Sequence, residues 1–401
     1  MPTNSKQRFW LMAIAVPILL VGLYYSFEEG RLVDLDVFLT AGERFTVGEM
    51  LYRTSDGHYQ FKYMPMAAAW FVPLSALPLH LARFIWMSVI VLSIAGSVIL
   101  ARRLIDPEKA SSRWLIPLSV LVLLKFYLRE TELGQTNAVY TFALLGMIAF
   151  LVAGRDIAAG LLLGLAATIK PYALMFLPYF AVTGRWRPAL IGLAATGAAL
   201  LFPGLVYGFS GNFELLRQWM AHLSKSTPAL LTNADNISLF GFFAKWLGPD
   251  NPNVVTLCAV GAAITLTGLM LLAMFRKRPT KGTSVEATQA SPRETLLLES
   301  AAILAAIPLL TPQGWDYIFV TGTLAVMMLI ARAESFLRPL RWVMMATLII
   351  IGGSVYDLMG ATLYRYFMEA SVLTVCYVMV VMLLIHLRFY LHDQGSVRES
   401  A

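Results

Sequence analysis

The sequence has few of the residues that cross-link small secreted domains or hold metal ions. Its 401 residues include two cysteines and five histidines, and the histidines form no HExxH or HxH motif. Cys258 and Cys376 each lie within an apolar run, which predicts buried thiols. We therefore expect no disulfide framework, no metal site and no cofactor.

Charge is also scarce. Asp, Glu, Lys and Arg make up 14% of the residues and hydrophobic residues 58%, with a mean hydropathy of +0.68. This composition excludes a soluble domain and predicts an all-α polytopic membrane protein surrounded by membrane lipids. The net charge of +7 is typical of basic cytoplasmic loops. No basic module with interleaved aromatic residues is present, so we expect no nucleic-acid partner.

Apolar runs predict about 12 transmembrane helices. They lie at about 9–27, 82–101, 114–129, 137–153, 157–169, 172–183, 188–207, 252–275, 296–311, 315–332, 340–356 and 368–388. An even number of crossings with a cytoplasmic N-terminus places most lysines and arginines in cytoplasmic segments, as the positive-inside rule requires. The first run follows Lys6 and Arg8 and lacks a small-residue cleavage site, so we interpret it as a retained span.

Residues 65–79 are apolar but do not fit this pattern of crossings. They contain three prolines. Their 15 residues are too few for a helix to span a roughly 30 Å hydrocarbon core. We expect this segment to lie flat in the outer interface, within a first outer loop at 28–81. The outer face would then also carry the loop 211–251.

Composition suggests three parts. A catalytic transmembrane module would occupy 1–210, followed by the outer loop 211–251 and by a C-terminal transmembrane module at 252–401. Within the last part, the polar segment 277–295 is typical of a flexible cytoplasmic linker. No convincing internal repeat is visible, and repeats are common in transporters.

Two acids open the first outer loop. A helix that starts near Asp34 would carry a buried stripe made of Leu35, Phe38, Leu39, Gly42 and Phe45. Residues two apart on a helix point roughly 200° apart, so Asp34 and Asp36 cannot face the same site. Either acid could accept a proton from an acceptor hydroxyl. The alternatives are that Asp34 is the helix N-cap and that Asp36 lies on a solvated face.

Lys170 lies in the middle of an apolar stretch, directly before Pro171. Proline disfavours a helical conformation of the preceding residue, so the chain should break at Lys170. The apolar arms on either side reach roughly 18–20 Å each, short of the bilayer core, which places the lysine in a recessed turn. A cation there suits a lipid-linked phosphate. The alternative is a lysine that extends to the headgroups from the end of a span.

Several outer-face residues are weaker candidates. Gln135 and Asn137 supply neutral donors and acceptors for sugar hydroxyls, or else Thr136 or Asn137 caps a helix that starts at Ala138. Trp315 is a sugar-stacking candidate or an interface anchor. We expect sugar or acceptor contacts from Asp36, Tyr63, Gln135, Asn137, His222, Trp315 and Asp316. Lys62, Arg129 and Arg365 are further phosphate candidates, or headgroup contacts.

The order and spacing of several motifs resemble glycosyltransferase family 87, a family of the GT-C superfamily of membrane enzymes. The matching residues are Asp34-Leu35-Asp36-Val37-Phe38, Ala41-Gly42, Gly48, Leu51-Tyr52, Phe61, Tyr63, Pro65, Gly134-Gln135, Asn137 and Ala159 to Lys170. The likeness covers residues 1–190, and the remainder matches by its pattern of spans. Phe38 stands where tyrosine is common, and Met64 where a second proline is common.

The resemblance implies a GT-C-like bundle with interfacial helices in its first outer loop. It implies a transferase that moves a sugar, with mannose expected, from a polyprenyl-phosphate donor to a lipid or glycan acceptor. Asp34 would be the general base of an inverting reaction, without a divalent metal, on the extracytoplasmic side of a bacterial plasma membrane. Lys170, with Lys62 or Arg365, would bind the donor phosphate. The competing hypotheses are a secondary transporter or lipid flippase, and a non-catalytic membrane assembly factor.

Overall fold

The computed structural model describes residues 30–57, 59–275 and 291–399, together with Leu20, Tyr24 and Glu28, and side chains as far as Leu391. Most of the predicted first span and of the predicted linker lies outside the described residues. The described chain is helical, and Asn236 and Trp315 form an isolated β-bridge. The fold is therefore that of a helical membrane protein, as the composition predicted.

The first half consists of two short helices followed by apolar helices of varied length. They are α2 (Val33–Thr46), α3 (Pro65–Ser75), α4 (Leu79–Leu104), α5 (Leu115–Leu133), α6 (Asn137–Val152), α7 (Asp156–Ile169), the 3-10 helix η3 (Pro171–Met175), α8 (Phe176–Val182), α9 (Trp186–Leu201) and α10 (Gly204–Leu230). The predicted boundary at 210 falls two residues after a kink in α10, where Gly208 is non-helical with φ of 69° and ψ of 161°. Most of the predicted loop 211–251 is helical.

The second half continues the bundle. It comprises α11 (Leu239–Leu247), α12 (Pro252–Phe275), α13 (Pro292–Leu310), the 3-10 helix η4 (Asp316–Gly322), α14 (Thr323–Ala331), α15 (Arg338–Gly353), α16 (Tyr356–Glu369) and α17 (Val372–Glu399). Three further 3-10 turns lie at Thr54–Asp56, Lys109–Ser111 and Ala333–Ser335. Residues 291–295 of the predicted linker are described: Ser291 caps α13 by accepting a hydrogen bond from the Glu294 N–H, 3.2 Å away.

Three described helices are long and apolar enough to cross a membrane: α4, α12 and α17. Two bent pairs raise this number to five if each pair is one span. These pairs are α9 with α10, bent by 93°, and α15 with α16, bent by 102°. Several shorter apolar helices lie between them, so the expected number of about 12 crossings stays a prediction.

Basic loops gather at one end of the bundle, which we call the basic end. Glu294, at the start of α13, forms ion pairs with Lys109, at 3.3 Å, and with Arg332. Arg293 donates hydrogen bonds to the carbonyl oxygens of Arg103 and Leu104 at 2.9 and 3.0 Å. The segments that follow α4 and α14 and precede α13 therefore lie together, as the predicted topology requires of segments on one side.

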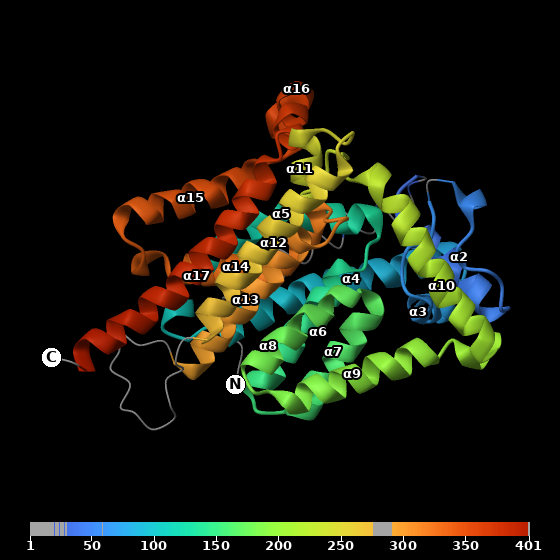
Figure 1. The fold of residues 1–401 in the computed structure, drawn as a ribbon, viewed down its shortest axis with the longest axis horizontal. Helices are drawn as coiled ribbons and strands as arrows, with labels where there is room; N and C mark the ends of the chain where they lie inside the picture. Colours follow the sequence, from blue (N-terminus) through green and yellow to red (C-terminus); the bar gives the residue numbers. More distant parts are fainter. Residues whose placement is uncertain are drawn as a thin grey trace.

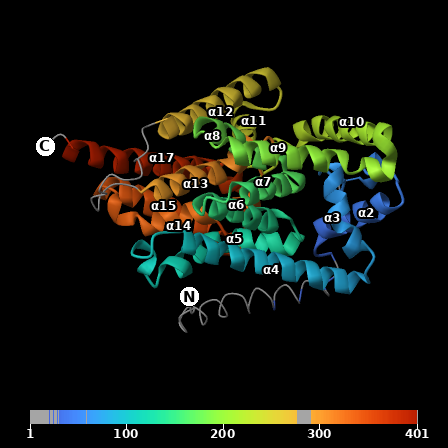
Figure 2. The same ribbon diagram turned by 90° about the horizontal axis from the view of Figure 1, so that it is seen from below.

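The opposite end, which we call the site end, collects the short helices. The Leu32 N–H donates to the Glu132 carbonyl at 3.0 Å and so joins the start of α2 to the end of α5. Figure 1 shows α2, α3 and α10 together on the right, away from the C-terminus. In both views α10 lies beside α2 and α3 (Figure 1, Figure 2).

Helices α2 and α3 pack against each other at close range. A Cβ on Gly42 would lie 2.9 Å from the Phe71 carbonyl carbon, so only glycine permits this approach. The ring of Phe38 stacks on that of Phe71, with centroids 4.8 Å apart. Helix α3 has 11 residues, or roughly 16 Å at 1.5 Å per residue, so it is too short to cross a bilayer.

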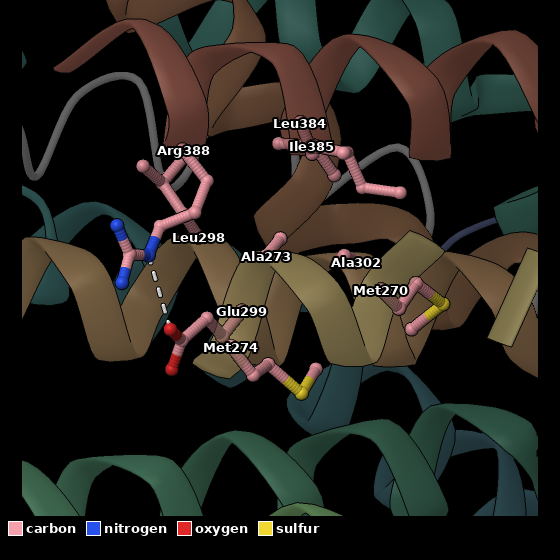
Figure 3. A pocket seen from close by; sticks show the side chains of 9 residues that line it. All are labelled: Met270, Ala273, Met274, Leu298, Glu299, Ala302, Leu384, Ile385 and Arg388. Atoms are coloured by element: carbon pink, nitrogen blue, oxygen red, sulfur yellow. Dashed lines mark hydrogen bonds and ion pairs between the residues drawn. The ribbon is translucent and has the colours of Figure 1, made fainter. Parts of the chain in front are cut away.

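A small pocket lies among α12, α13 and α17 (Figure 3). Most of its lining is aliphatic or methionine, and one charged pair stands within it: Glu299 accepts a hydrogen bond from Arg388 at 3.0 Å. Both side chains are buried, which fixes the register of α13 against α17. Because Glu299 follows Glu294 by five residues on α13, this pocket belongs to the basic half of the bundle.

Candidate functional site

Asp34 lies in the first turn of α2, and the helix begins earlier than an Asp34 cap would allow. The N-cap is Leu32, in a left-handed conformation with φ of 59°, and no side chain caps the helix. The N-cap interpretation of Asp34 is therefore wrong, because the residue is already helical. The predicted buried stripe is confirmed: Leu35, Phe38, Leu39, Gly42 and Phe45 are all buried.

The carboxylate of Asp34 is held by one amide. Gln135 Nε2 donates to Asp34 Oδ2 at 2.7 Å, and Gln135 Oε1 accepts from the Tyr63 hydroxyl at 2.9 Å. The hydroxyl of Thr136 lies 3.4 Å from that of Tyr63. Because a tyrosine donor occupies the oxygen side of the amide, its nitrogen side faces Asp34.

The turn between α5 and α6 packs directly against α2. Gly134 adopts φ of 71°, and a Cβ there would lie 2.9 Å from the Leu35 Cβ, so both conformation and space require glycine. Trp86 Nε1 on α4 donates to the Gly134 carbonyl at 2.8 Å. This close fit brings Gln135 within reach of Asp34.

Lys170 lies where the sequence predicted a break. Helix α7 ends at Ile169, Lys170 is extended, and a 3-10 turn starts at Pro171. The lysine side chain is 7% exposed, so it turns into the protein and does not extend to the headgroups. Its Nζ donates to Asn137 Oδ1 at 2.6 Å and lies 5.4 Å from the centre of the Tyr63 ring.

Asn137 connects this lysine to a buried acid. Glu130 Oε2 accepts from Asn137 Nδ2 at 2.8 Å, and Glu130 Oε1 accepts from the Ala138 N–H at 2.7 Å. The side chains of Thr136 and Asn137 do not cap α6, so this alternative is wrong and Glu130 provides the cap. Asn137 uses both ends of its amide inside the protein, and its expected contact with sugar stays a prediction.

Two kinds of effect on the pKa of Asp34 oppose each other. Burial raises the pKa of Asp34 above its ordinary value, while the Gln135 hydrogen bond and the positive charges of Lys170, Arg129 and Lys62 act to lower it. The net shift is upward. The pKa of Lys62 is lowered by burial, against the charge of Asp34. Asp34 is a partly exposed residue, and the charges of three cations act on its carboxylate.

Asp36 points elsewhere, as the helical spacing predicted. Arg83 Nη2 on α4 donates to Asp36 Oδ2 at 2.9 Å and to Oδ1 at 3.2 Å. The Asp36 side chain is 44% exposed and that of Arg83 only 9%. The ion pair joins α2 to α4 and separates Asp36 from the Gln135 network.

Helix α10 covers the loop that carries Lys62. Trp219 Nε1 donates to the Lys62 carbonyl at 3.0 Å. The ring of His222 stacks on that of Tyr52, with centroids 6.1 Å apart. His222 therefore lies next to the first outer loop, close enough to Lys62 for their charges to interact.

The remaining predicted residues are distributed around a second charged cluster. Asp316 is buried and pairs with Lys125 on α5 at 2.7 Å. The ring of Trp315 lies parallel to that of Tyr317, 6.5 Å away. Arg365 is exposed on α16 and lies against the Tyr366 ring. Among the described residues, no contact joins Arg365 to Asp34, and its phosphate-binding role stays a prediction.

Sequence reasoning missed Glu130 and Arg83. Glu130 looks like a polar end to an apolar run, and its partners come only after a turn. The sequence feature that could have identified Glu130 is an acid on the apolar face of a helix, shortly before the polar segment from Gly134 to Asn137. Arg83 follows a run of interfacial residues by a few positions and resembles a headgroup contact. Neither partner can be assigned without the fold.

The model of glycosyltransferase family 87 matches residues 61–292, more than half of the chain. The match includes Gln135, Asn137 and Lys170, and Asp34 precedes it. No solved structure matches the chain.

Two relatives come from Mycolicibacterium smegmatis. A polyprenol-phosphate-mannose-dependent alpha-(1-2)-phosphatidylinositol pentamannoside mannosyltransferase is 29% identical over 262 residues, which cover 62% of this chain and 59% of that protein. A polyprenol-phosphate-mannose-dependent alpha-(1-2)-phosphatidylinositol mannoside mannosyltransferase is 27% identical over 340 residues, covering 79% and 73%. The chain thus spans less than two thirds of the first relative. With the family model matched over more than half of its length, the chain belongs to glycosyltransferase family 87.

Proposed function

We propose that the chain transfers mannose from a polyprenyl-phosphate donor to a hydroxyl group of a lipid or glycan acceptor, with inversion at the anomeric carbon. The observation that carries this proposal is Asp34, a partly exposed residue whose carboxylate is held by Gln135 at 2.7 Å and is acted on by the charges of Lys170, Arg129 and Lys62. The names of both relatives support the donor, and they make a phosphatidylinositol mannoside the first acceptor to test.

Asp34 would act as the general base. Its Oδ2 takes the Gln135 hydrogen bond, and no described residue donates to its Oδ1, which is left for the acceptor. The acceptor hydroxyl gives its proton to Asp34 while its oxygen bonds to the anomeric carbon. The bond from that carbon to the phosphate oxygen breaks, and its electron pair leaves with polyprenyl phosphate. A positioned base contributes roughly 10²–10⁴ in rate.

Lys170 and Lys62 would stabilise the charge on the departing phosphate. A cation in a site with little water stabilises developing negative charge far more than a cation in bulk water does. By the positive-inside rule the basic end would face the cytoplasm, and the site end lies opposite it, which supports a reaction on the extracytoplasmic side. The short helices α2 and α3 would lie in the outer headgroup layer, where a lipid-linked donor presents its phosphate.

The direct test is an assay of the full-length protein in lipid nanodiscs. We expect transfer of radiolabelled mannose from polyprenyl-phosphate mannose to a phosphatidylinositol mannoside or another envelope glycolipid, and no transfer from a nucleotide-linked mannose. Parallel liposomes with a fluorescent lipid measure movement between leaflets. Lipid movement without mannose transfer would favour a flippase, and neither activity would favour an assembly factor.

The activity should also show an acid limb set by Asp34. The base must be deprotonated, and burial raises the pKa of Asp34, so kcat/KM should fall as pH decreases through a value above that of an ordinary aspartate. The Gln135 hydrogen bond lowers the pKa of Asp34, so Gln135→Leu should move this limb to higher pH. The measurement is kcat/KM against pH for both proteins. A limb that stays in place in Gln135→Leu would contradict the assignment.

A further inference from the structure

We propose that Glu130 is a positioning residue for the phosphate-binding site: it fixes the orientation of the Asn137 amide, which in turn holds the Lys170 ammonium group in place. This inference deepens the proposed function, on which it rests through the role given to Lys170. The three residues come from three separate elements, the end of α5, the start of α6 and the break after α7.

The orientation follows from the chemistry of the donors. An ionised carboxylate only accepts hydrogen bonds, so the group of Asn137 that faces Glu130 must be its NH₂. The 2.8 Å contact of Asn137 Nδ2 with Glu130 Oε2 fulfils this requirement. The amide oxygen is then turned the other way and accepts from Lys170 Nζ at 2.6 Å. A reversed amide would place a donor against the lysine, which only donates.

Burial makes this arrangement strict. Glu130 and Asn137 are both 0% exposed and Lys170 is 7% exposed, so little water is available to replace a lost partner. A buried charge without a partner is strongly unfavourable, and the negative charges of two carboxylates, Glu130 and Asp34, act on the lysine. Glu130 therefore supplies both the orientation and the opposite charge that keep a cation below the surface of the site.

Glutamine at position 130 separates this role from simple helix capping. Its Oε1 can still accept from the Ala138 N–H, so the cap of α6 survives in Glu130→Gln. Its NH₂ group would instead meet the NH₂ group of Asn137, donor against donor, and the Asn137 amide would turn away from Lys170. Asn137→Asp produces the opposite conflict, with two carboxylates facing each other.

The double variant Glu130→Gln with Asn137→Asp restores every contact. Glutamine 130 donates to one oxygen of the aspartate, and the other oxygen of the aspartate accepts from Lys170. The carboxylate and the amide exchange places, while net charge and side-chain lengths at both positions stay the same. This exchange is a strict test, because a change at one position is rescued by a change at the other.

The experiment uses the full-length protein in nanodiscs and two readouts. The first is the KM for polyprenyl-phosphate mannose and kcat; the second is binding of sugar-free polyprenyl phosphate, measured from the shift in melting temperature. We expect each single variant to weaken polyprenyl-phosphate binding and to raise the donor KM by about 10-fold or more. The double variant should return to within about threefold of the wild type in both readouts.

Three results would overturn the inference. They are single variants that bind polyprenyl phosphate like the wild type, a folded double variant that binds no better than the singles, and a wild-type protein that does not bind this lipid. If a single variant does not fold, the comparison of double variant with wild type decides. The binding readout does not depend on catalysis, so a protein that binds the lipid but transfers no mannose refutes the proposed reaction and leaves this inference standing.

Discussion

Replacing Asp34 with asparagine should reduce mannosyl transfer by roughly 10²–10⁴-fold, the contribution expected of a positioned general base. Asparagine has the same shape as aspartate, and its side-chain oxygen can still accept the 2.7 Å hydrogen bond from Gln135. What the variant loses is the capacity to take a proton. Because burial raises the pKa of Asp34, folding disfavours the charged form, so the neutral asparagine should not lower the melting temperature.

The matched control is Asp56→Asn, which makes the same chemical change in the same outer loop. Asp56 accepts hydrogen bonds from Arg44 at 2.6 and 2.8 Å and has no contact with the Gln135 network among the described residues. Its loss should leave turnover within a few-fold of the wild type. The decisive comparison is with Asp36→Asn: if Asp34→Asn retains turnover and Asp36→Asn loses it, the base has been assigned to the wrong acid.

Local patterns in the sequence were enough to predict the buried face of α2, although not where the helix begins. The spacing of Leu35, Phe38 and Leu39 predicted a helix with one buried face, and the structure confirms this face. The same periodicity predicted that Asp36 would point away from Asp34. These predictions succeeded because helical periodicity depends only on residues within one or two turns of each other.

The break at Lys170 could also be predicted from neighbouring residues alone. Pro171 restricts the residue before it, and the structure shows Lys170 extended at the end of α7. The direction of the Lys170 side chain could not be predicted from neighbouring residues. Whether the ammonium group turns outward to lipid headgroups or inward to Asn137 depends on a helix 33 residues earlier in the chain.

Long-range pairing explains what the sequence could not predict. Asp34 and Gln135 are 101 residues apart, and Asp36 and Arg83 are 47 apart. No periodicity connects such positions. The bend between α9 and α10 was missed for a related reason, since the apolar run at 188–207 continues through the bend and hydropathy alone reports one uninterrupted segment.

These long-range contacts give the site a simple construction. The turn between α5 and α6 contributes Gln135, which binds Asp34, and, two residues later, Asn137, which binds Lys170. Tyr63 lies between the two, donating to Gln135 and presenting its ring to Lys170. One short turn thus sets the distance between the group that would remove the acceptor proton and the group that would receive the departing phosphate.

The second large effect is expected from Lys170→Ala, which should lower kcat/KM by about 10- to 100-fold, the effect of losing one charge-assisted hydrogen bond to phosphate. The loss should appear both as a higher KM for the polyprenyl-phosphate donor and as a lower kcat, because phosphate carries charge in the bound donor and more in the transition state. Lys170→Met is the companion variant, since it keeps most of the side-chain volume that the alanine removes.

The matched control is Lys109→Met at the basic end, where the lysine pairs with Glu294 at 3.3 Å, and its kinetics should match the wild type. Donor KM and kcat unchanged in both Lys170 variants would exclude the lysine from donor binding, and would leave Arg129 and Lys62 as the cations that act on Asp34.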